Sequence, residues 1–436
     1  MLGGAGRPIV GPDNANRGIV SLTESTPVPA ALPDLVDPSF WARPHEERVA
    51  LFEELRGLPH PAFIRQSMPG VPWVSGYHAL VKYADIAEVS RRPQDFSSNG
   101  ATTIVGLPPE LDEYYGSMIN MDNPEHSRLR RIVSRSFGRN TVPEFEAVAT
   151  RTARRIIREL VARGPGDFIR PVAAEMPIAV LSDMMGIPEE DHEFLFERSN
   201  TIVGPLDPDY VADPANAERA VIEASRELGD YIARLRDDRL ARPGNDLITK
   251  LVQVQWDGEQ LTRQELVSFF ILLVIAGMET TRNAISHALV LLTEHPEQKQ
   301  LLLSDFDAHA KNAVEEILRV STPINWMRRV AARDCELNGH RFRRGDRVFL
   351  FYWSGNRDES VFPDPYRFDI TRGSHAHVTF GAVGPHVCLG AHLARLEITV
   401  LYRELLAALP GIRAVGRPRR LQSSFVEGIK HLDCAF

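Results

Sequence analysis

A single cysteine near the C-terminus, Cys388, has neighbours that suit it to chemistry. Gly381 and Gly384 precede it, and glycine permits backbone conformations and close approaches that a side chain would prevent. After the cysteine, apolar residues recur at helical spacing: Leu389, Leu393, Leu396 and Val400. The sulfur is therefore expected at the start of a helix, where unpaired amides and the helix dipole favour a thiolate. Such a thiolate, in a glycine-lined loop above an apolar helix, is suited to bind a soft metal in a flat cofactor.

Cys388 has three other interpretations. It can be a small buried hydrophobe, which is the common fate of cysteine. It can form a zinc site with the flanking His386 and His392, although no fourth ligand is evident nearby. It can also be the nucleophile of a thiol hydrolase that uses a histidine base. The context of the cysteine favours the cofactor ligand over all three.

One long helix is predicted over residues 262–294, well beyond the average helix of about 11–12 residues. Its middle, residues 269–275, is apolar on all sides, which predicts burial through the core. Glu279 and Thr280 follow this run and can act as an acid–alcohol pair, because a carboxylate relays protons from solvent and a hydroxyl holds a water. The alternative is a threonine that only hydrogen-bonds a carbonyl of its own helix. The buried run and the downstream cysteine favour the catalytic interpretation.

Four segments, in this order along the chain, resemble landmarks of the cytochromes P450: residues 122–130 the haem-propionate helix, 276–281 the oxygen-activation helix, 316–319 the Glu-x-x-Arg element and 380–395 the haem-binding segment. The resemblance covers the chain from about Phe40 to its end. It implies the cytochrome P450 fold, which is mainly α with a minor β portion (α+β). It also implies that Cys388 is the metal ligand of haem b (iron protoporphyrin IX).

The resemblance assigns further residues to the site. It implies that the acid–alcohol pair is catalytic, and that the haem and its propionates contact His126, Arg130, Arg329, His386, Ala276, Gly277, Phe380 and Gly381. Arg328 is an alternative to its neighbour at the propionate. Glu316 and Arg319 share one helix face at a spacing of three residues and are assigned a structural salt bridge, with Arg372 as candidate third member.

The loop before the cysteine is one residue longer than in the commonest pattern of the family, because Phe380 stands eight residues before Cys388. This length resembles that of actinobacterial P450s that hydroxylate methyl-branched lipids and sterol side chains. By analogy, the substrate contacts the loop of residues 97–107 and the side chains of Leu273, Val274, Ile324, Met327, Phe425 and Val426. These walls are mostly apolar and offer no obvious charged anchor, which suits a long hydrocarbon or sterol tail.

Composition limits the class of protein. Hydrophobic residues make up 43% of the 436 residues and charged residues 25%, as in soluble globular proteins. The net charge of −8 argues against a general nucleic-acid-binding surface. Three cysteines are too few for a disulfide framework and indicate a reducing compartment, the cytoplasm. No apolar signal segment is seen at the N-terminus, and the apolar stretch 267–278 is shorter than the ~20 residues that span a bilayer, so no membrane anchor is expected.

Two parts are predicted along the chain. Residues 1–35, rich in Gly, Pro, Ser and Thr, are expected to form a flexible arm, and residues 36–436 a single catalytic domain. Further helices are predicted within residues 38–58, 77–91, 126–137, 142–162, 175–185, 189–200 and 216–239. A short strand pair is expected over residues 63–75. Short strands are also expected between Arg328 and Leu350, where Cys335-Glu-Leu followed by Asn338-Gly339 is a strong hairpin signal.

A run of arginines suggests a docking surface: Arg128, Arg130, Arg131, Arg135 and Arg139. The P450 resemblance implies that a ferredoxin and a ferredoxin reductase deliver two electrons, and this run suits an acidic ferredoxin. A plain solvated helix face remains an alternative. Nucleic acid is disfavoured, because no reader motif or aromatic interleaving accompanies the arginines.

The expected function is that of a haem-thiolate monooxygenase, which uses dioxygen to hydroxylate an unactivated C–H bond of a hydrophobic substrate. The subgroup resemblance implies the terminal carbon of a methyl-branched lipid, an isoprenoid or a sterol side chain. One alternative is a biosynthetic P450 that acts on a polyketide or macrolide. A non-enzymatic alternative is a haem-based ligand sensor or carrier, against which Glu279 and Thr280 argue, because a binder needs no proton relay.

Overall fold

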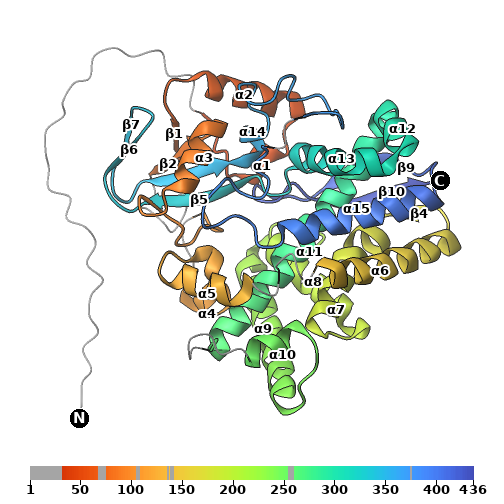
Figure 1. Cartoon of the computed structure of the whole chain (residues 1–436). Coiled ribbons are helices and arrows are strands. Elements are labelled where there is room, and N and C mark those ends of the chain that lie inside the picture. Colours follow the sequence, from red (N-terminus) through yellow and green to blue (C-terminus); the bar gives the residue numbers. More distant parts are fainter. Residues whose placement is uncertain are drawn as a thin grey trace, which may run out of the picture. The chain divides into compact units, whose positions relative to one another are not determined.

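The structure is a computed structural model of the chain (Figure 1). It describes residues 32–66, 75–104, 109–134, 137, 142–253, 260–373 and 376–436. The expected flexible arm falls almost wholly on residues outside this set. Its last residue does not belong to an arm, because Leu35 is 0% exposed. The Leu35 amide donates a hydrogen bond of 2.9 Å to the Tyr77 hydroxyl, so the packed chain begins slightly before the expected boundary.

Helices make up most of the described structure, which confirms the mainly α fold with a minor β portion. The α-helices are α1 Pro38–Trp41, α2 His45–Gly57, α3 Tyr83–Arg91, α4 Pro109–Tyr115, α5 Glu125–Ser134, α6 Val142–Arg163, α7 Glu175–Met185, α8 His192–Val203, α9 Ala217–Ala241, α10 Leu247–Gln253, α11 Arg263–Glu294, α12 Pro296–Ser304, α13 Phe306–Ser321, α14 Tyr352–Gly355 and α15 Ala391–Ala408. The expected α7 has the predicted bounds.

The central helix is α11, drawn in green in Figure 1. It begins with a capping box, in which the Thr262 hydroxyl accepts from the Glu265 amide at 3.1 Å and the Glu265 carboxylate accepts from the Thr262 amide at 2.8 Å. Helices α7, α8, α9, α13 and α15 pack against it. Of the described helices, α11 alone is long and apolar enough to cross a membrane, by length and composition only. Its packing marks it as the core helix of this fold.

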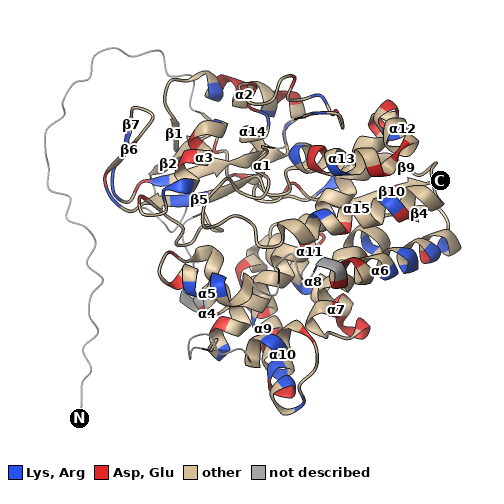
Figure 2. Cartoon of the chain, viewed as in Figure 1, with Lys and Arg blue, Asp and Glu red and all other residues tan. Residues whose placement is uncertain are grey.

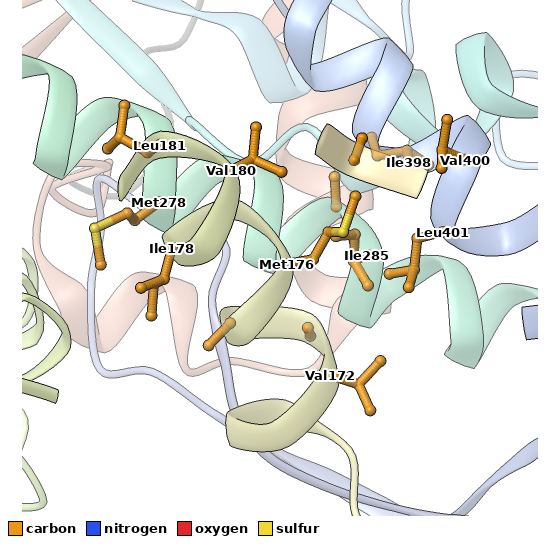
Figure 3. Packing of buried hydrophobic residues seen from close by; sticks show 14 of the residues in the cluster. Val172, Met176, Ile178, Val180, Leu181, Met278, Ile285, Ile398, Val400 and Leu401 are labelled. Atoms are coloured by element: carbon orange, nitrogen blue, oxygen red, sulfur yellow. The ribbon is translucent and has the colours of Figure 1, made fainter. Parts of the chain in front are cut away.

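The core lies where α7, α11 and α15 meet. Figure 3 shows side chains from these three helices in one cluster: Met176, Ile178, Val180 and Leu181 of α7, Met278 and Ile285 of α11, and Ile398, Val400 and Leu401 of α15. This cluster fixes α11 relative to α15. Because Glu279 and Thr280 lie on α11 and Cys388 immediately precedes α15, the packing of the core sets the distance between the two halves of the site.

Three small sheets complete the fold. One has the order β1 Ala62–Arg65, β2 Gly76–Leu80, β8 Arg347–Phe351, β5 Trp326–Ala331 and β3 Phe96–Ser97, with β2 and β8 parallel and the other pairs antiparallel. A second has the order β4 Gly166–Asp167, β10 Ile429–Ala435 and β9 Arg413–Arg420. The third is the hairpin of β6 Cys335–Leu337 and β7 His340–Phe342, which was predicted; Asn338 and Gly339 have φ of 47° and 78°, as its turn requires.

The expectation of a single helix over residues 77–91 is wrong at its start. The segment forms the strand β2 first and turns into α3 only at Tyr83. Tyr77 pairs with Ile64 of β1, and its ring lies 4.6 Å from that of Phe349, between centroids. Pairing with neighbouring strands and burial on both faces outweigh the local helical spacing. Most of the second strand of the expected pair over 63–75 falls on residues outside the described set.

Candidate functional site

A cavity of about 610 Å³ lies between α11 and the loop that precedes α15. Cys388 lines one side of it, and Ala276, Gly277, Glu279 and Thr280 line the other. Strand β5 and the turn after β9 supply further walls. The structure therefore brings the sequence-predicted residues from the long helix and the cysteine loop to one space.

The loop before Cys388 has the close backbone packing that its glycines predict. The Cys388 amide donates to the Phe380 carbonyl at 2.9 Å, which closes the loop, and Gly381 has a φ of +78°. A Cβ on Gly384 would lie 2.0 Å from the Ser90 carbonyl oxygen, so any other residue there would collide with the end of α3. Phe380 and Gly381 both line the cavity, as expected of cofactor contacts.

The Cys388 sulfur faces the cavity and meets opposing influences on its charge. Burial raises the pKa of the thiol. Hydrogen bonds from the amides of Gly390 and Ala391, together with the charges of Arg130 and Arg395, act to lower it. A thiolate here is thus stabilised by the helix start but needs a further positive partner, which a metal ion supplies. Within the described residues no set of three His, Cys, Asp or Glu side chains could hold a metal ion, which argues against the zinc alternative.

A cationic cluster forms another part of the cavity wall: His126, Arg130, Arg329 and His386. The imidazole rings of His126 and His386 lie 4.1 Å apart, between centroids. Arg130 donates to the Val387 carbonyl at 2.7 Å. Burial, with the charge of Arg329, lowers the pKa of His386 to about 3, and burial also lowers the pKa of Arg329 itself. The positive charge of this region is therefore that of Arg130 and Arg329, which an anionic ligand would offset, while His386 is uncharged near neutral pH.

The hydrogen-bond partners of Arg328 and Arg329 indicate which of the two can contact a propionate. Arg328 donates to the carbonyls of Gly100, at 3.1 and 2.8 Å, and Asn99, at 3.0 Å, and so supports the loop after β3. Arg329 lines the cavity. The structure therefore places Arg329, and not Arg328, where a propionate contact is predicted.

The acid and the alcohol on α11 have separate partners. Thr280 donates its hydroxyl to the Ala276 carbonyl at 2.7 Å, which is the back-bonding that was named as the alternative. Glu279 is buried and forms an ion pair with Arg282, which in turn donates to the Asn200 side chain at 2.8 Å. Burial raises the pKa of Glu279. Both residues line the cavity, so the back-bond leaves the hydroxyl free to accept a hydrogen bond there.

The predicted structural pair is buried behind the cysteine loop. Glu316 accepts two hydrogen bonds of 2.8 Å from Arg319 and one of 3.2 Å from Arg372. Arg319 also donates to the carbonyls of Asn356, at 2.9 Å, and Pro365, at 2.7 Å. This network ties α13 to the segment before the cysteine loop, as the structural assignment expects.

Most of the expected substrate contacts lie in the cavity wall. The side chains that line it are Leu273, Ile324, Met327, Phe425 and Val426, together with Ala101, Thr102, Thr103 and Ile104 of the expected loop. Residues 97–100 of that loop do not line the cavity, and the carbonyls of Asn99 and Gly100 accept hydrogen bonds from Arg328 instead. Residues 105–107 lie outside the described residues. Val274 is a correction, because it is 0% exposed and packs in the core instead. Side chains turn by about 100° from one helical residue to the next, and at Val274 this direction leads into the core rather than the cavity.

Sequence reasoning missed several cavity residues. Leu181 of α7 and Leu206 of the segment after α8 line the cavity, and neither stands in a recognisable motif. Arg282 was also missed, although its spacing of three residues from Glu279 is a signal for an ion pair. Glu397 of α15 lines the cavity too, and burial raises its pKa to about 8.

These residues fit haem b. The sulfur of Cys388 faces the cavity, and the cationic cluster would meet the two propionates. Asp122 is a carboxylate whose charge acts on Arg329. Its hydrogen bonds, however, come from the hydroxyl of Ser97 and, at 2.7 Å, from the amide of Ser98, and not from the cluster. Bound here, the haem supplies an iron that binds and activates dioxygen, and thiolate ligation favours O–O cleavage.

Comparisons with known proteins agree with this fit. The family model described as Cytochrome P450 matches residues 75–409. A methyl-branched lipid omega-hydroxylase of Mycobacterium tuberculosis is 42% identical over 424 residues, which cover 96% of this chain and 98% of that protein. A steroid C26-monooxygenase of Rhodococcus jostii is 37% identical over 91% of this chain and 83% of that protein. The structure of a Mycobacterium marinum cytochrome P450 in complex with pseudoionone matches with a TM-score of 0.88 and 38% identity, over 94% of this chain and 100% of that one. The chain therefore belongs to the cytochrome P450 family, whose members are haem-thiolate monooxygenases.

Proposed function

We propose that this P450 hydroxylates the terminal carbon of a methyl-branched lipid or of a sterol side chain. Two kinds of relative support the proposal, since one is named for omega-hydroxylation of methyl-branched lipids and the other for oxidation at C26 of steroids. Both names place the oxidised carbon at the end of a branched aliphatic chain. The feature that the two classes of substrate share is therefore the terminal methyl group of a branched chain.

The observation that carries the proposal is the apolar lining of the cavity away from the cationic cluster. The aliphatic and aromatic residues of that lining include Leu181, Ile202, Val203, Leu272, Leu273, Ile275, Met327, Phe425 and Val426. The acidic residues that line the described part of the cavity are Glu279, which pairs with Arg282, and Glu397. A lining of this kind binds a hydrocarbon tail through burial, which contributes about 0.8 kcal/mol for each CH₂ group.

Terminal hydroxylation requires that the walls hold the chain end-on, because attack at a branched carbon is intrinsically easier than attack at a methyl group. Positioning therefore has to overcome the intrinsic reactivity. Leu273 is well placed to contribute, since it lines the cavity on the same helix as Ala276 and Thr280. We expect the Leu273→Ala variant to widen the cavity and to shift oxidation from the terminal carbon towards positions inside the chain.

The test is product analysis by gas chromatography and mass spectrometry, with 15-methylhexadecanoic acid and cholest-4-en-3-one as substrates. The native protein should give mainly terminal alcohols from both. Val274→Ala is the matched control, because Val274 is the next residue of α11 but packs in the core. It should lower stability and leave the product distribution unchanged. Mainly in-chain or ring oxidation by the native protein would contradict the proposal.

We further propose that a ferredoxin and a ferredoxin reductase supply the electrons, and that the protein works in the cytoplasm. The electron carrier would dock near the cysteine loop, where Arg131 of α5 is exposed. Further Arg residues, blue in Figure 2, lie along α6. Two of the five arginines of the sequence run, Arg135 and Arg139, lie outside the described residues, and Arg128 pairs with Glu265. The three cysteines are all free, as in a reducing compartment.

A further inference from the structure

Two segments that are distant in sequence form neighbouring walls of the cavity. One is the α8–α9 connection, residues 204–213, of which Pro205 and Leu206 line the cavity. The other is the β9–β10 turn, residues 421–428, whose residues 422–426 line it. The distance between these two segments therefore helps to set the width of the cavity.

Asp207 of the α8–α9 connection is 0% exposed although it is a carboxylate. It accepts a hydrogen bond of 2.9 Å from the amide of Gln422, which belongs to the β9–β10 turn. Its other oxygen accepts from the amide of Asp209 at 3.0 Å and from the ammonium group of Lys430 at 2.6 Å. A buried carboxylate is costly unless a cation accompanies it, so Lys430 is what allows Asp207 to reach the turn.

Lys430 lies on β10, and its side chain is 7% exposed. Its ammonium group binds two acidic residues of the α8–α9 connection, Asp207 at 2.6 Å and Asp209 at 3.0 Å. A second cation, Arg419 of β9, also binds Asp209, at 3.1 Å, but its side chain is 61% exposed. The two cations thus contact the same segment, and only the buried one should hold it firmly, because solvent and salt weaken exposed pairs.

The packing beside this ion pair leaves no spare room. A Cβ built on Gly204 would lie 2.8 Å from both the Leu421 and the Tyr210 side chains. The start of the α8–α9 connection is thus pressed against the first residue of the β9–β10 turn. A small movement of the connection would separate these surfaces, and Pro205 and Leu206 would move with it.

We propose that Lys430 is a positioning residue of this monooxygenase: by neutralising Asp207 it holds the α8–α9 connection against the β9–β10 turn, and so governs the entry of ligands and the placement of the substrate. It contributes to specificity through these walls and does not touch the reacting carbon. The part of the proposal that concerns product distribution rests on the proposed function. The part that concerns ligand entry does not.

The test compares Lys430→Met with the native holoprotein. Methionine keeps the length and apolar stem of lysine but leaves the Asp207 carboxylate without its cation. We expect 4-phenylimidazole, whose imidazole nitrogen is a ligand for haem iron, to bind and dissociate at least about tenfold faster in stopped-flow absorbance, since the loss of a buried partner destabilises the closed arrangement. Hydrogen–deuterium exchange of peptides covering residues 203–212 should rise as well.

Two further variants complete the test. Arg419→Met is the matched control, because it removes the exposed cation from the same segment, and it should leave rates and exchange unchanged. Asp207→Asn/Lys430→Met removes both buried charges while the side-chain oxygen can still accept from the Gln422 amide. This variant guards against simple misfolding of the single variant, and it should still show faster binding because the ionic tie is gone.

Native rates of 4-phenylimidazole binding in both the single and the double variant would overturn the proposal. With 15-methylhexadecanoic acid, Lys430→Met should also yield a smaller share of terminal alcohol. If no variant binds this acid but the 4-phenylimidazole rates rise, the lipid assignment fails while the role of Lys430 stands. If every variant hydroxylates the acid to the same products, and the 4-phenylimidazole rates are unchanged, the lipid assignment stands and the proposed role of Lys430 fails.

Discussion

The hydroxyl of Thr280 can both donate and accept a hydrogen bond, and it donates to a carbonyl of its own helix. It donates to the Ala276 carbonyl at 2.7 Å, so its lone pairs remain able to accept a proton donor in the cavity. We expect Thr280→Ala to lower the product formed per NADPH consumed roughly tenfold, which is below the range of about 10²–10⁴ that a positioned proton transfer as a whole contributes. Electrons would go to hydrogen peroxide instead. Product and peroxide are measured together against NADPH.

A matched control for this change is Ser286→Ala. Ser286 makes the same type of back-bond on α11, donating to the Arg282 carbonyl at 2.7 Å, but it does not line the cavity. Its loss should leave the ratio of product to NADPH as in the native protein. An equal fall in both variants would show that the back-bond, and not the position in the cavity, determines the effect.

Glu397 makes stability depend on pH. Burial raises its pKa from 4.5 to about 8, so the folded protein holds a proton that the unfolded chain releases. Between pH 4.5 and about pH 8 the free energy of unfolding should fall as the pH rises, by roughly 1.4 kcal/mol for each pH unit. It should level off above pH 8. Glu397→Gln should remove this contribution. Urea titrations at a series of pH values measure it.

Glu294→Gln serves as the comparison, since Glu294 is exposed at the end of α11. Its stability curve should run parallel to that of the native protein. If the curve of Glu397→Gln is also parallel to the native one, Glu397 does not carry a proton in the folded state. The raised pKa depends on burial alone, which sequence patterns do not report.

At the scale of single residues, sequence motifs located the groups with chemistry and left their partners unknown. Cys388, Glu279 and Thr280 were found because their types are rare at such spacings, and the structure brings all three to one cavity. The zinc-site and hydrolase interpretations gave way to the family assignment. The mistake at Val274 was one of direction, since a pattern of apolar residues does not say which side of a fully apolar helix faces a cavity.

Among the elements, α13 depends most on a buried ion pair. Arg319→Met would leave the Glu316 carboxylate with Arg372 as its remaining cation and would remove donors from the carbonyls of Asn356 and Pro365. We expect a loss of about 3–5 kcal/mol in the free energy of unfolding, as is usual when one partner of a buried pair is removed. The urea midpoint and the yield of holoprotein report it.

An exposed pair between helices provides the control for Arg319. Arg403 of α15 binds Asp307 of α13 at 3.0 Å, with both side chains largely exposed. Arg403→Met should leave the urea midpoint close to that of the native protein, because exposed pairs contribute little. Similar losses of unfolding free energy in the two variants would mean that the buried pair contributes no more to stability than the exposed pair.

Elements were predictable where local signals and tertiary contacts agree. α7 has the expected bounds through a long apolar run, and the β6–β7 hairpin lies where Asn338-Gly339 predicts it. The segment 77–91 was mistaken because strand pairing with β1 and β8 determines its first half. The α8–α9 connection could not be foreseen as a cavity wall, because its place depends on a buried ion pair with a strand over 200 residues away.

The whole molecule carries a net charge of −8, which would repel an acidic electron carrier on average. Attraction of the proposed ferredoxin would therefore have to be local. Near the cysteine loop the structure exposes Arg131 of α5 and, at the end of α3, Arg91, next to the residue that the loop touches at Gly384. Val383 at the tip of that loop is 67% exposed. We take these exposed residues, called the basic rim below, as the groups that a ferredoxin would meet; Arg91 also has Glu88 at 3.8 Å as a partner. Two basic groups and one apolar group suit a weak and transient complex.

If this rim receives the ferredoxin, reduction of the haem should depend on salt. The Debye length shortens from about 10 Å at 0.1 M to about 3 Å at 1 M, so we expect the second-order rate constant of reduction to fall at least about tenfold over this range. Arg131→Glu and Arg91→Glu should each slow the reaction at low salt and make it less sensitive to salt. Arg219→Glu, on the exposed face of α9, changes the net charge equally and should have a much smaller effect. Stopped-flow reduction under carbon monoxide measures all four proteins, and equal effects of the three substitutions would mean that net charge, and not this rim, directs the encounter.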